Sequence, residues 1–136
     1  MKLIILTILV SVCLFSCKKD DNQTNIGNHK IVGTWINPQY NDTLVTYDRA
    51  GNLKENELGF TFKTDNTCIA RQNSGWCGTP PITTADYEGT YTLTDSIVNI
   101  NVGYWGGTID YTWKIISVDE KKLTIATIKV LYQNGG

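Results

Sequence analysis

The sequence predicts an all-β domain, an eight-stranded antiparallel up-and-down barrel that follows an N-terminal signal peptide. Apolar and polar residues alternate along most of the chain after residue 30, which is the pattern of strands with one buried face. β-branched and aromatic residues dominate these runs, as strands favour. Short clusters of Gly, Asn and Asp separate the runs at spacings that suit antiparallel hairpins. A closed barrel removes unpaired strand edges; a small sandwich is the alternative architecture.

The N-terminal residues 1–16 have the order of a secretory signal peptide. Lys2 precedes an apolar run from Leu3 to Phe15, about 13 residues long, which fits the length of about 7–15 residues of a secretory apolar core. A membrane-spanning helix needs about 20 residues, so this run is too short to be one. We therefore expect residues 1–16 to be removed from the mature chain.

Residues 17–30 are polar and contain too few apolar side chains to pack, so we expect a flexible tether. It holds His29, the only histidine of the chain. Beyond it we expect one domain, residues 31–132, and a disordered tail at residues 133–136. Without Lys2 the chain keeps 11 of its 12 basic residues against 13 acidic ones. This balance provides no basic patch, so we expect no nucleic-acid partner.

The eight strands are expected between clusters of turn residues. The first four lie at about 32–37, 43–48, 57–64 and 67–73, separated by residues 38–42, 49–56 and the turn at 65–66. The last four lie at about 86–93, 96–102, 108–117 and 122–130, separated by turns at 94–95, 106–107 and 119–120. The alternation is clearest in the seventh strand, where Ile109, Tyr111, Trp113 and Ile115 share one face.

The residues around Cys17 resemble the lipobox of bacterial lipoproteins. Leu14 stands three residues before Cys17 and the small residue Ser16 stands just before it, as the lipobox requires. The resemblance implies that Cys17 receives a diacylglyceryl group and becomes the first residue of the mature chain. Each buried CH₂ adds about 0.8 kcal/mol of membrane affinity, so two or three acyl chains anchor a protein stably.

The tetrad after the lipidated cysteine, Lys18-Lys19-Asp20-Asp21, resembles the surface-export signal of Bacteroidetes lipoproteins. The resemblance implies a protein that is lipid-anchored in the outer membrane and exposed at the cell surface. The alternative interpretation is the start of a solvated linker. We expect Cys17 to provide the membrane contact, and the sequence does not predict an oligomeric state.

The segment Ile31-Val32-Gly33-Thr34-Trp35 resembles the Gly-x-Trp opening of lipocalins and their relatives. In that family the tryptophan closes one barrel end, so the resemblance gives this role to Trp35, with Gly33. Residues 59–67 resemble the central hairpin of bacterial lipocalin-like lipoproteins, and residues 89–93 and 123–125 are similar to that family too. Lipocalins also place a basic residue from the last strand over the tryptophan, and Lys129 is our candidate. The resemblance therefore implies a lipocalin-like barrel over about residues 31–130.

The sequence offers little catalytic chemistry. A catalytic triad needs a base, and the histidine of this chain lies in the expected tether. The sequence contains no Gly-x-Ser-x-Gly elbow and no glycine-rich phosphate loop. The carboxylate pairs Glu55/Glu57 and Asp86/Glu88 fit a solvated outer face. We expect no enzyme activity and no catalytic residue, no cofactor, and no metal, because a Cys/His zinc site would lack ligands.

Two of the four cysteines remain available for a disulfide. Cys13 leaves with the signal peptide and Cys17 is acylated. Cys68 and Cys77 remain in a compartment that permits disulfides, and we expect them to pair. We place Cys68 on the outward face of its strand, so that the bond would tie the next loop to the barrel wall.

Loop aromatics are the candidate binding residues. Trp76 lies in one glycine-flanked loop, and Tyr104 and Trp105 lie in another. Such side chains can contact a ligand or fill the end of a small barrel. Counting strands puts the loops after the second, fourth and sixth strands at the end where the tether enters, whereas the lipocalin resemblance puts the mouth at the opposite end. We expect the mouth beside the aromatic loops, at the tether end.

These observations predict a non-enzymatic, lipid-anchored envelope protein whose barrel binds a small apolar or amphiphilic ligand. One alternative is a surface module that binds glycan or protein through its aromatic loops. Another is an inhibitor of a secreted enzyme. An apolar cavity inside the barrel would favour the first interpretation, and a filled barrel with exposed indoles would favour the others.

Overall fold

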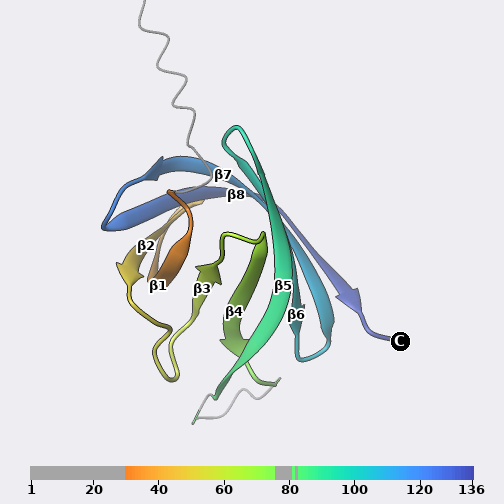
Figure 1. Cartoon of the computed structure of the whole chain (residues 1–136). Helices are drawn as coiled ribbons and strands as arrows, with labels where there is room; N and C mark the ends of the chain where they lie inside the picture. Colours follow the sequence, from red (N-terminus) through yellow and green to blue (C-terminus); the bar gives the residue numbers. More distant parts are fainter. Residues whose placement is uncertain (1–29, 76–80, 82) are drawn as a thin grey trace, which may run out of the picture.

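Eight antiparallel strands form a closed barrel in the computed structural model, which describes residues 30–75, 81 and 83–136 (Figure 1). The strands are β1 (Gly33–Asn41), β2 (Leu44–Ala50), β3 (Gly59–Phe62), β4 (Thr67–Asn73), β5 (Thr84–Thr94), β6 (Ile97–Tyr104), β7 (Gly107–Val118) and β8 (Lys122–Asn134). The predicted all-β class and the closed eight-stranded barrel are confirmed. β8 continues to Asn134, which lies within the segment expected to be a disordered tail.

The strand order departs from a plain up-and-down barrel at one connection. Around the barrel the order is β1-β2-β8-β7-β6-β5-β4-β3, so β2 pairs with β8, and β3 pairs with β1. Residues 51–58 therefore pass β1 instead of closing a hairpin, and β2 and β3 run in the same direction. A Cβ on Gly59, at the end of this passage, would lie 2.6 Å from the Trp35 carbonyl oxygen and 3.0 Å from Leu53. Glycine permits this close approach because it has no side chain.

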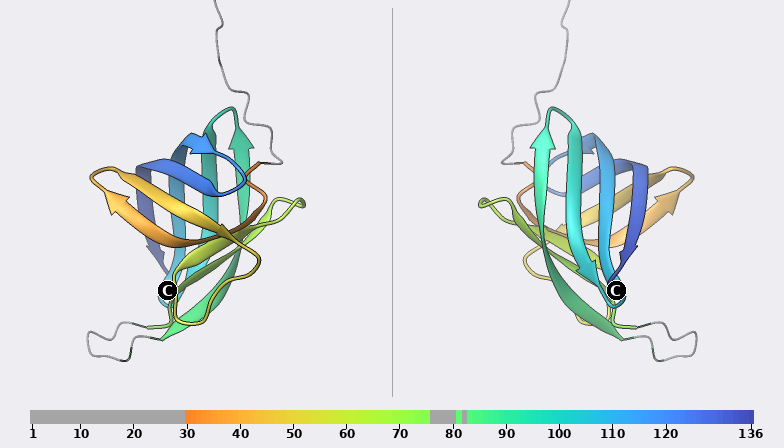
Figure 2. Two further views of the ribbon diagram at one scale, coloured as in Figure 1. Left: turned by 90° about the vertical axis from the view of Figure 1, so that its left-hand side faces the viewer. Right: turned by 90° about the vertical axis from the view of Figure 1, so that its right-hand side faces the viewer.

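This crossing decides which loops share a barrel end. The end of β4, the start of β5 and the β6–β7 turn lie at the same end as the β1–β2 turn, whereas Lys30 lies at the other end with the β5–β6 and β7–β8 turns (Figure 2). The prediction that the aromatic loops gather where the tether enters is therefore wrong, because it assumed that β2 and β3 form a hairpin. The β6–β7 turn, with Trp105, lies opposite Lys30, at the end where the lipocalin resemblance places the mouth.

Trp35 closes the end of the barrel at which Lys30 lies. Its side chain is 0% exposed and its indole Nε1 donates a hydrogen bond to the Ile31 carbonyl at 2.7 Å. The Arg49 guanidinium lies 4.2 Å above the indole ring. Gly33 has a φ of 133°, and a Cβ there would collide with the same guanidinium. The Gly-x-Trp segment therefore needs its glycine so that Arg49 can reach the ring.

The basic residue over Trp35 comes from β2 and not from the last strand. Arg49 also donates hydrogen bonds to the Val32 carbonyl at 3.0 Å and to the Lys30 carbonyl at 2.9 Å. Lys129, which the family pattern suggested, is exposed and pairs with Thr112 on β7. We refer to the end that contains Trp35 and Arg49 as the closed end, and to the opposite end as the mouth.

The core occupies the closed end and the middle of the barrel. Phe62 and Tyr91 pack edge to face with ring centroids 4.9 Å apart, and the Tyr91 hydroxyl donates to the Lys63 carbonyl at 2.7 Å. The buried core residues are Ile31, Trp35, Val45, Tyr47, Phe60, Phe62, Cys68, Ala70, Tyr91, Val98, Ile100, Val102, Trp113, Ile115, Leu123 and Ile125.

Cys68 belongs to this core, so its predicted place on the outward face is wrong. The side chain is 1% exposed, and Cys68 and Ala70 alternate with the less buried Ile69 along β4. The structure records Cys68 as a free thiol rather than as part of the expected disulfide; Cys77 lies outside the described residues. Five residues of strand, about 16 Å, also separate Cys68 from the mouth end of β4. Burial raises the pKa of the Cys68 thiol to about 11.

Candidate ligand-binding cavity

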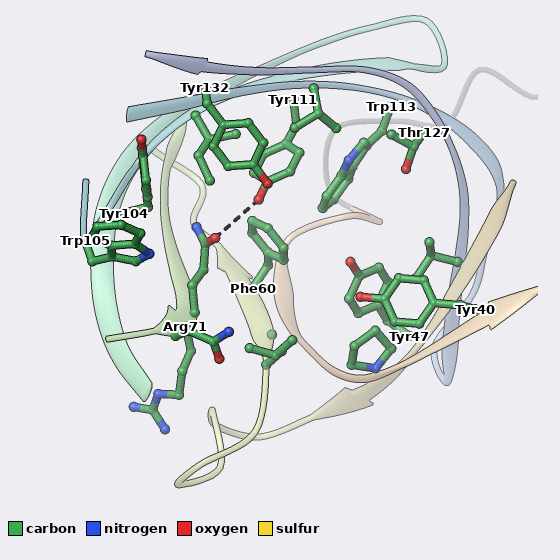
Figure 3. Close-up of a pocket in the computed structure, with 18 residues that line it drawn as sticks. Tyr40, Tyr47, Phe60, Arg71, Tyr104, Trp105, Tyr111, Trp113, Thr127 and Tyr132 are labelled. Carbon is green, nitrogen blue, oxygen red and sulfur yellow. Dashed lines mark hydrogen bonds between the residues drawn. The ribbon is translucent and has the colours of Figure 1, made fainter. Parts of the chain in front are cut away.

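A cavity of about 390 Å³ opens at the mouth (Figure 3). This volume is within the range of about 300–1,000 Å³ that is usual for small-molecule sites. Aromatic side chains from six strands and the β6–β7 turn make up much of its lining: Tyr40, Tyr47, Phe60, Tyr104, Trp105, Tyr111, Trp113 and Tyr132. The barrel is therefore filled at the closed end and hollow at the mouth.

Phe60 and Trp113 form the floor of the cavity. Their rings pack edge to face with centroids 4.9 Å apart, and both side chains are buried. Tyr111 packs edge-on against Phe60 at 5.9 Å, and Tyr47 lies 6.0 Å from Trp113. These residues face inward because alternate residues of β2, β3 and β7 point into the barrel. The floor separates the cavity from the packed core around Trp35.

Exposed aromatic rings form the rim. Tyr40 is 70% exposed, Trp105 is 52% exposed and Tyr132 is 65% exposed. Tyr104 packs edge-on against both Trp105 and Tyr132, with centroids 5.8 and 5.6 Å apart. Its hydroxyl donates to the Asn134 side chain at 2.9 Å. The structure therefore places Tyr104 and Trp105 at the cavity, and their role in ligand binding stays a prediction. Trp76 lies outside the described residues.

The wall beside the cavity is incomplete along β8. The pairing of β2 with β8 ends at Leu44, which lies opposite Ala126. Beyond Ala126, β8 continues to Asn134 and pairs, among the described residues, only with strand β7. Val130 and Tyr132 line the cavity from this stretch, and both are exposed. The cavity is therefore bordered by an unpaired strand edge on one side.

A small polar network reaches the cavity from β4. The Tyr111 hydroxyl donates to Gln72 Oε1 at 3.3 Å, and Gln72 Nε2 donates to the Gly103 carbonyl at 3.3 Å. Burial raises the pKa of Tyr111 and of Tyr47 well above that of a free tyrosine. Both hydroxyls therefore stay protonated and neutral over the ordinary pH range.

The aliphatic part of the Arg71 side chain lines the cavity, while its guanidinium pairs with Asp86 on β5. Arg71 Nε lies 2.6 Å from Asp86 Oδ1 and Nη2 lies 2.9 Å from Oδ2, a bidentate pair. The register sets this contact, because Arg71 stands opposite Asp86 in the β4–β5 ladder. The pair lowers the pKa of Asp86 and raises that of Arg71.

The sequence does not predict several of the residues that line the cavity. Tyr40 falls in a stretch that the sequence predicted to be a turn, residues 38–42, but β1 continues through an irregularity between Ile36 and Gln39. Asn37 has a φ of 55° there, and the altered register brings Tyr40 to the cavity. The alternation in the seventh strand does identify Tyr111 and Trp113 as inward-facing residues. The alternation does not distinguish residues that line a cavity from residues that pack in a filled core.

Comparisons with protein-family models, with curated proteins and with solved structures find no match. Within the described residues, no helix is long and apolar enough to cross a membrane. No group of three or more His, Cys, Asp or Glu residues in the same part of the chain could hold a metal ion. The geometry of the cavity is therefore the main guide to function.

Proposed function

We propose that this chain is a non-enzymatic binding protein that holds a small, largely apolar molecule in the mouth cavity. The observation that carries the proposal is an aromatic-lined hollow of about 390 Å³ above a packed floor. A ligand that fills it would leave water and cover exposed rings such as Tyr132, which is where the favourable free energy of binding arises. Its lining among the described residues has no carboxylate, imidazole or thiol, which favours binding over catalysis.

We further propose that the domain is lipocalin-like and is anchored in the outer membrane through acylated Cys17, with the barrel at the cell surface. Trp35 at one barrel end with Arg49 above its ring supports the first part. The signal-like residues 1–16 and the tetrad after Cys17 support the second. The chain enters the barrel at Lys30, at the closed end, so a tethered barrel has its mouth at the far end from the anchor segment.

A second candidate function is recognition of a glycan or a protein surface by the rim. Tyr40, Trp105 and Tyr132 are all more than half exposed, and exposed rings can stack on sugars or on a partner. This function would use the outer faces of the rim rings and leave the cavity empty.

Adjacent residues of β8 offer a matched test, because Val130 lines the cavity and its neighbour Leu131 does not. The closed sheet and its core lie within residues 30–136, so a chain that begins at residue 18 keeps the whole barrel. We would titrate it with N-phenyl-1-naphthylamine, a neutral apolar fluorophore. Val130→Trp fills the cavity and should weaken binding at least tenfold, whereas Leu131→Trp should leave it unchanged.

Equal binding by both variants would place the fluorophore outside the cavity and contradict the proposal. No binding by the unmodified chain, together with glycan binding that Tyr132→Ala abolishes, would support the rim function instead.

A further inference from the structure

Several of the segments around the mouth contain no charged residue. Residues 72–75, 83–85, 97–109 and 130–136, which include the mouth ends of β4 to β8, have no Asp, Glu, Lys or Arg. The β1–β2 turn contains Asp42, and residues 51–58 contain Lys54, Glu55 and Glu57. Among the described residues that line the cavity, Arg71 alone has a charged side chain. Whether the site can accept an anion therefore depends on Arg71.

The guanidinium of Arg71 pairs with Asp86 and lies away from the cavity in this arrangement. Asp86 accepts hydrogen bonds from both Nε and Nη2, at 2.6 and 2.9 Å. Glu55 adds a second negative charge to its surroundings. Figure 3 shows the guanidinium directed away from the aromatic rings, so the cavity side of Arg71 is its aliphatic stem.

The remaining polar groups at the cavity are neutral donors and acceptors. They include the Tyr47 and Tyr111 hydroxyls and the Gln72 amide. No hydrogen bond among the described residues involves the Tyr47 hydroxyl, so it can donate to a ligand. Neutral donors can satisfy a hydroxyl, carbonyl or ether oxygen, but a buried carboxylate or sulfonate also needs a positive charge to offset the cost of leaving water.

We infer that the cavity selects an uncharged amphiphile with a flat apolar body, and that Asp86 sets this selection by holding the charge of Arg71 away from the ligand. This inference rests on the proposed function, since it names the class of ligand for the same cavity. Neutral ring-bearing molecules with one or two oxygen atoms belong to the accepted class. Fatty acids and other organic anions of the same size are excluded from it.

Two fluorophores with the same aromatic skeleton provide the test. N-phenyl-1-naphthylamine is neutral, and 1-anilinonaphthalene-8-sulfonate adds one negative charge. The chain from residue 18 onward should bind the neutral probe at least tenfold more tightly than the anionic one. Asp86→Asn should raise the affinity for the anionic probe about threefold or more, because it frees the guanidinium of Arg71. The affinity for the neutral probe should stay unchanged.

Asp110 supplies the matched control. Its carboxylate on β7 accepts hydrogen bonds from the Asn101 and Gln133 side chains and does not line the cavity. Asp110→Asn should leave both affinities unchanged. Equal affinity of the unmodified chain for the two probes would overturn the selection and leave the proposed function standing. An unchanged preference in Asp86→Asn would overturn the role of Asp86, whereas no binding of either probe would contradict the proposed function itself.

Discussion

Replacing Arg49 by Met should destabilise the closed end without affecting the mouth. The change removes the cation above the Trp35 ring, at 4.2 Å, an interaction worth about 0.5–2 kcal/mol. It also removes the hydrogen bond to the Val32 carbonyl at 3.0 Å and leaves that carbonyl without its donor, at a cost of about 1–3 kcal/mol. The bond to the Lys30 carbonyl is exposed and adds little.

One feature of Arg49 reduces this loss. Its Nε is buried without a hydrogen-bond partner among the described residues, so the native side chain already carries part of a desolvation cost that Met would relieve. The net expectation is a fall of about 2–3 kcal/mol in the free energy of unfolding. Arg49→Lys keeps the charge but cannot reach two carbonyls at once, as the forked guanidinium does. Its free energy of unfolding should therefore fall by about half as much.

Urea unfolding monitored by tryptophan fluorescence measures both variants. The midpoint should fall while the dependence of the free energy on urea stays unchanged. Affinity for N-phenyl-1-naphthylamine should also stay unchanged, because the cavity lies beyond the floor formed by Phe60 and Trp113. A loss below about 0.5 kcal/mol for Arg49→Met would refute the role given to the closed end.

Two further predictions concern titrating groups. In a Cys77→Ser chain that begins at residue 18, the Cys68 thiol should react with an aromatic disulfide reagent only after unfolding, because it is buried and its pKa is raised to about 11; fast reaction of the folded protein would contradict the inward orientation. Hydrogen bonds lower the pKa of Asp48, Asp65, Asp86 and Asp119 from the ordinary value of 3.8. The folded state therefore gains stability from these carboxylates above about pH 4 and loses it as the pH falls through their lowered pKa values. The midpoint of urea unfolding, measured between about pH 2 and 6, should fall as the pH is lowered. It should fall less steeply in Asp65→Asn. A midpoint that rises on acidification would contradict the expected direction.

The sequence predicts the strands well because the alternation of apolar and polar residues reports directly on burial. In β7, Ile109, Trp113 and Ile115 are buried as the pattern indicates. The same signal says nothing about which strands are neighbours. Residues 51–58 have the composition of a hairpin loop, yet they pass β1, and this single crossing moves the later loops to the other barrel end.

Errors at individual residues have a related cause. Cys68 comes just after the turn at residues 65–66, and an error of one residue in the start of a strand reverses the predicted face of every side chain in it. Tyr40 lies where the sequence indicates a turn, but the irregularity near Asn37 lets the strand continue and brings Tyr40 to the cavity. The hollow above Phe60 depends on how far eight strands are offset around the barrel, which no local pattern encodes.

The most direct test of the central claim is to map the ligand onto the barrel. Amide chemical shifts of the chain from residue 18 onward should be recorded while N-phenyl-1-naphthylamine is added. The cavity predicts that the largest changes fall on Phe60, Tyr111 and Tyr132 at the mouth, with little change at Asp95 and Glu120 in the turns of the closed end. Changes centred on the closed end, or spread over the outer faces of the strands, would contradict a binding site inside the mouth.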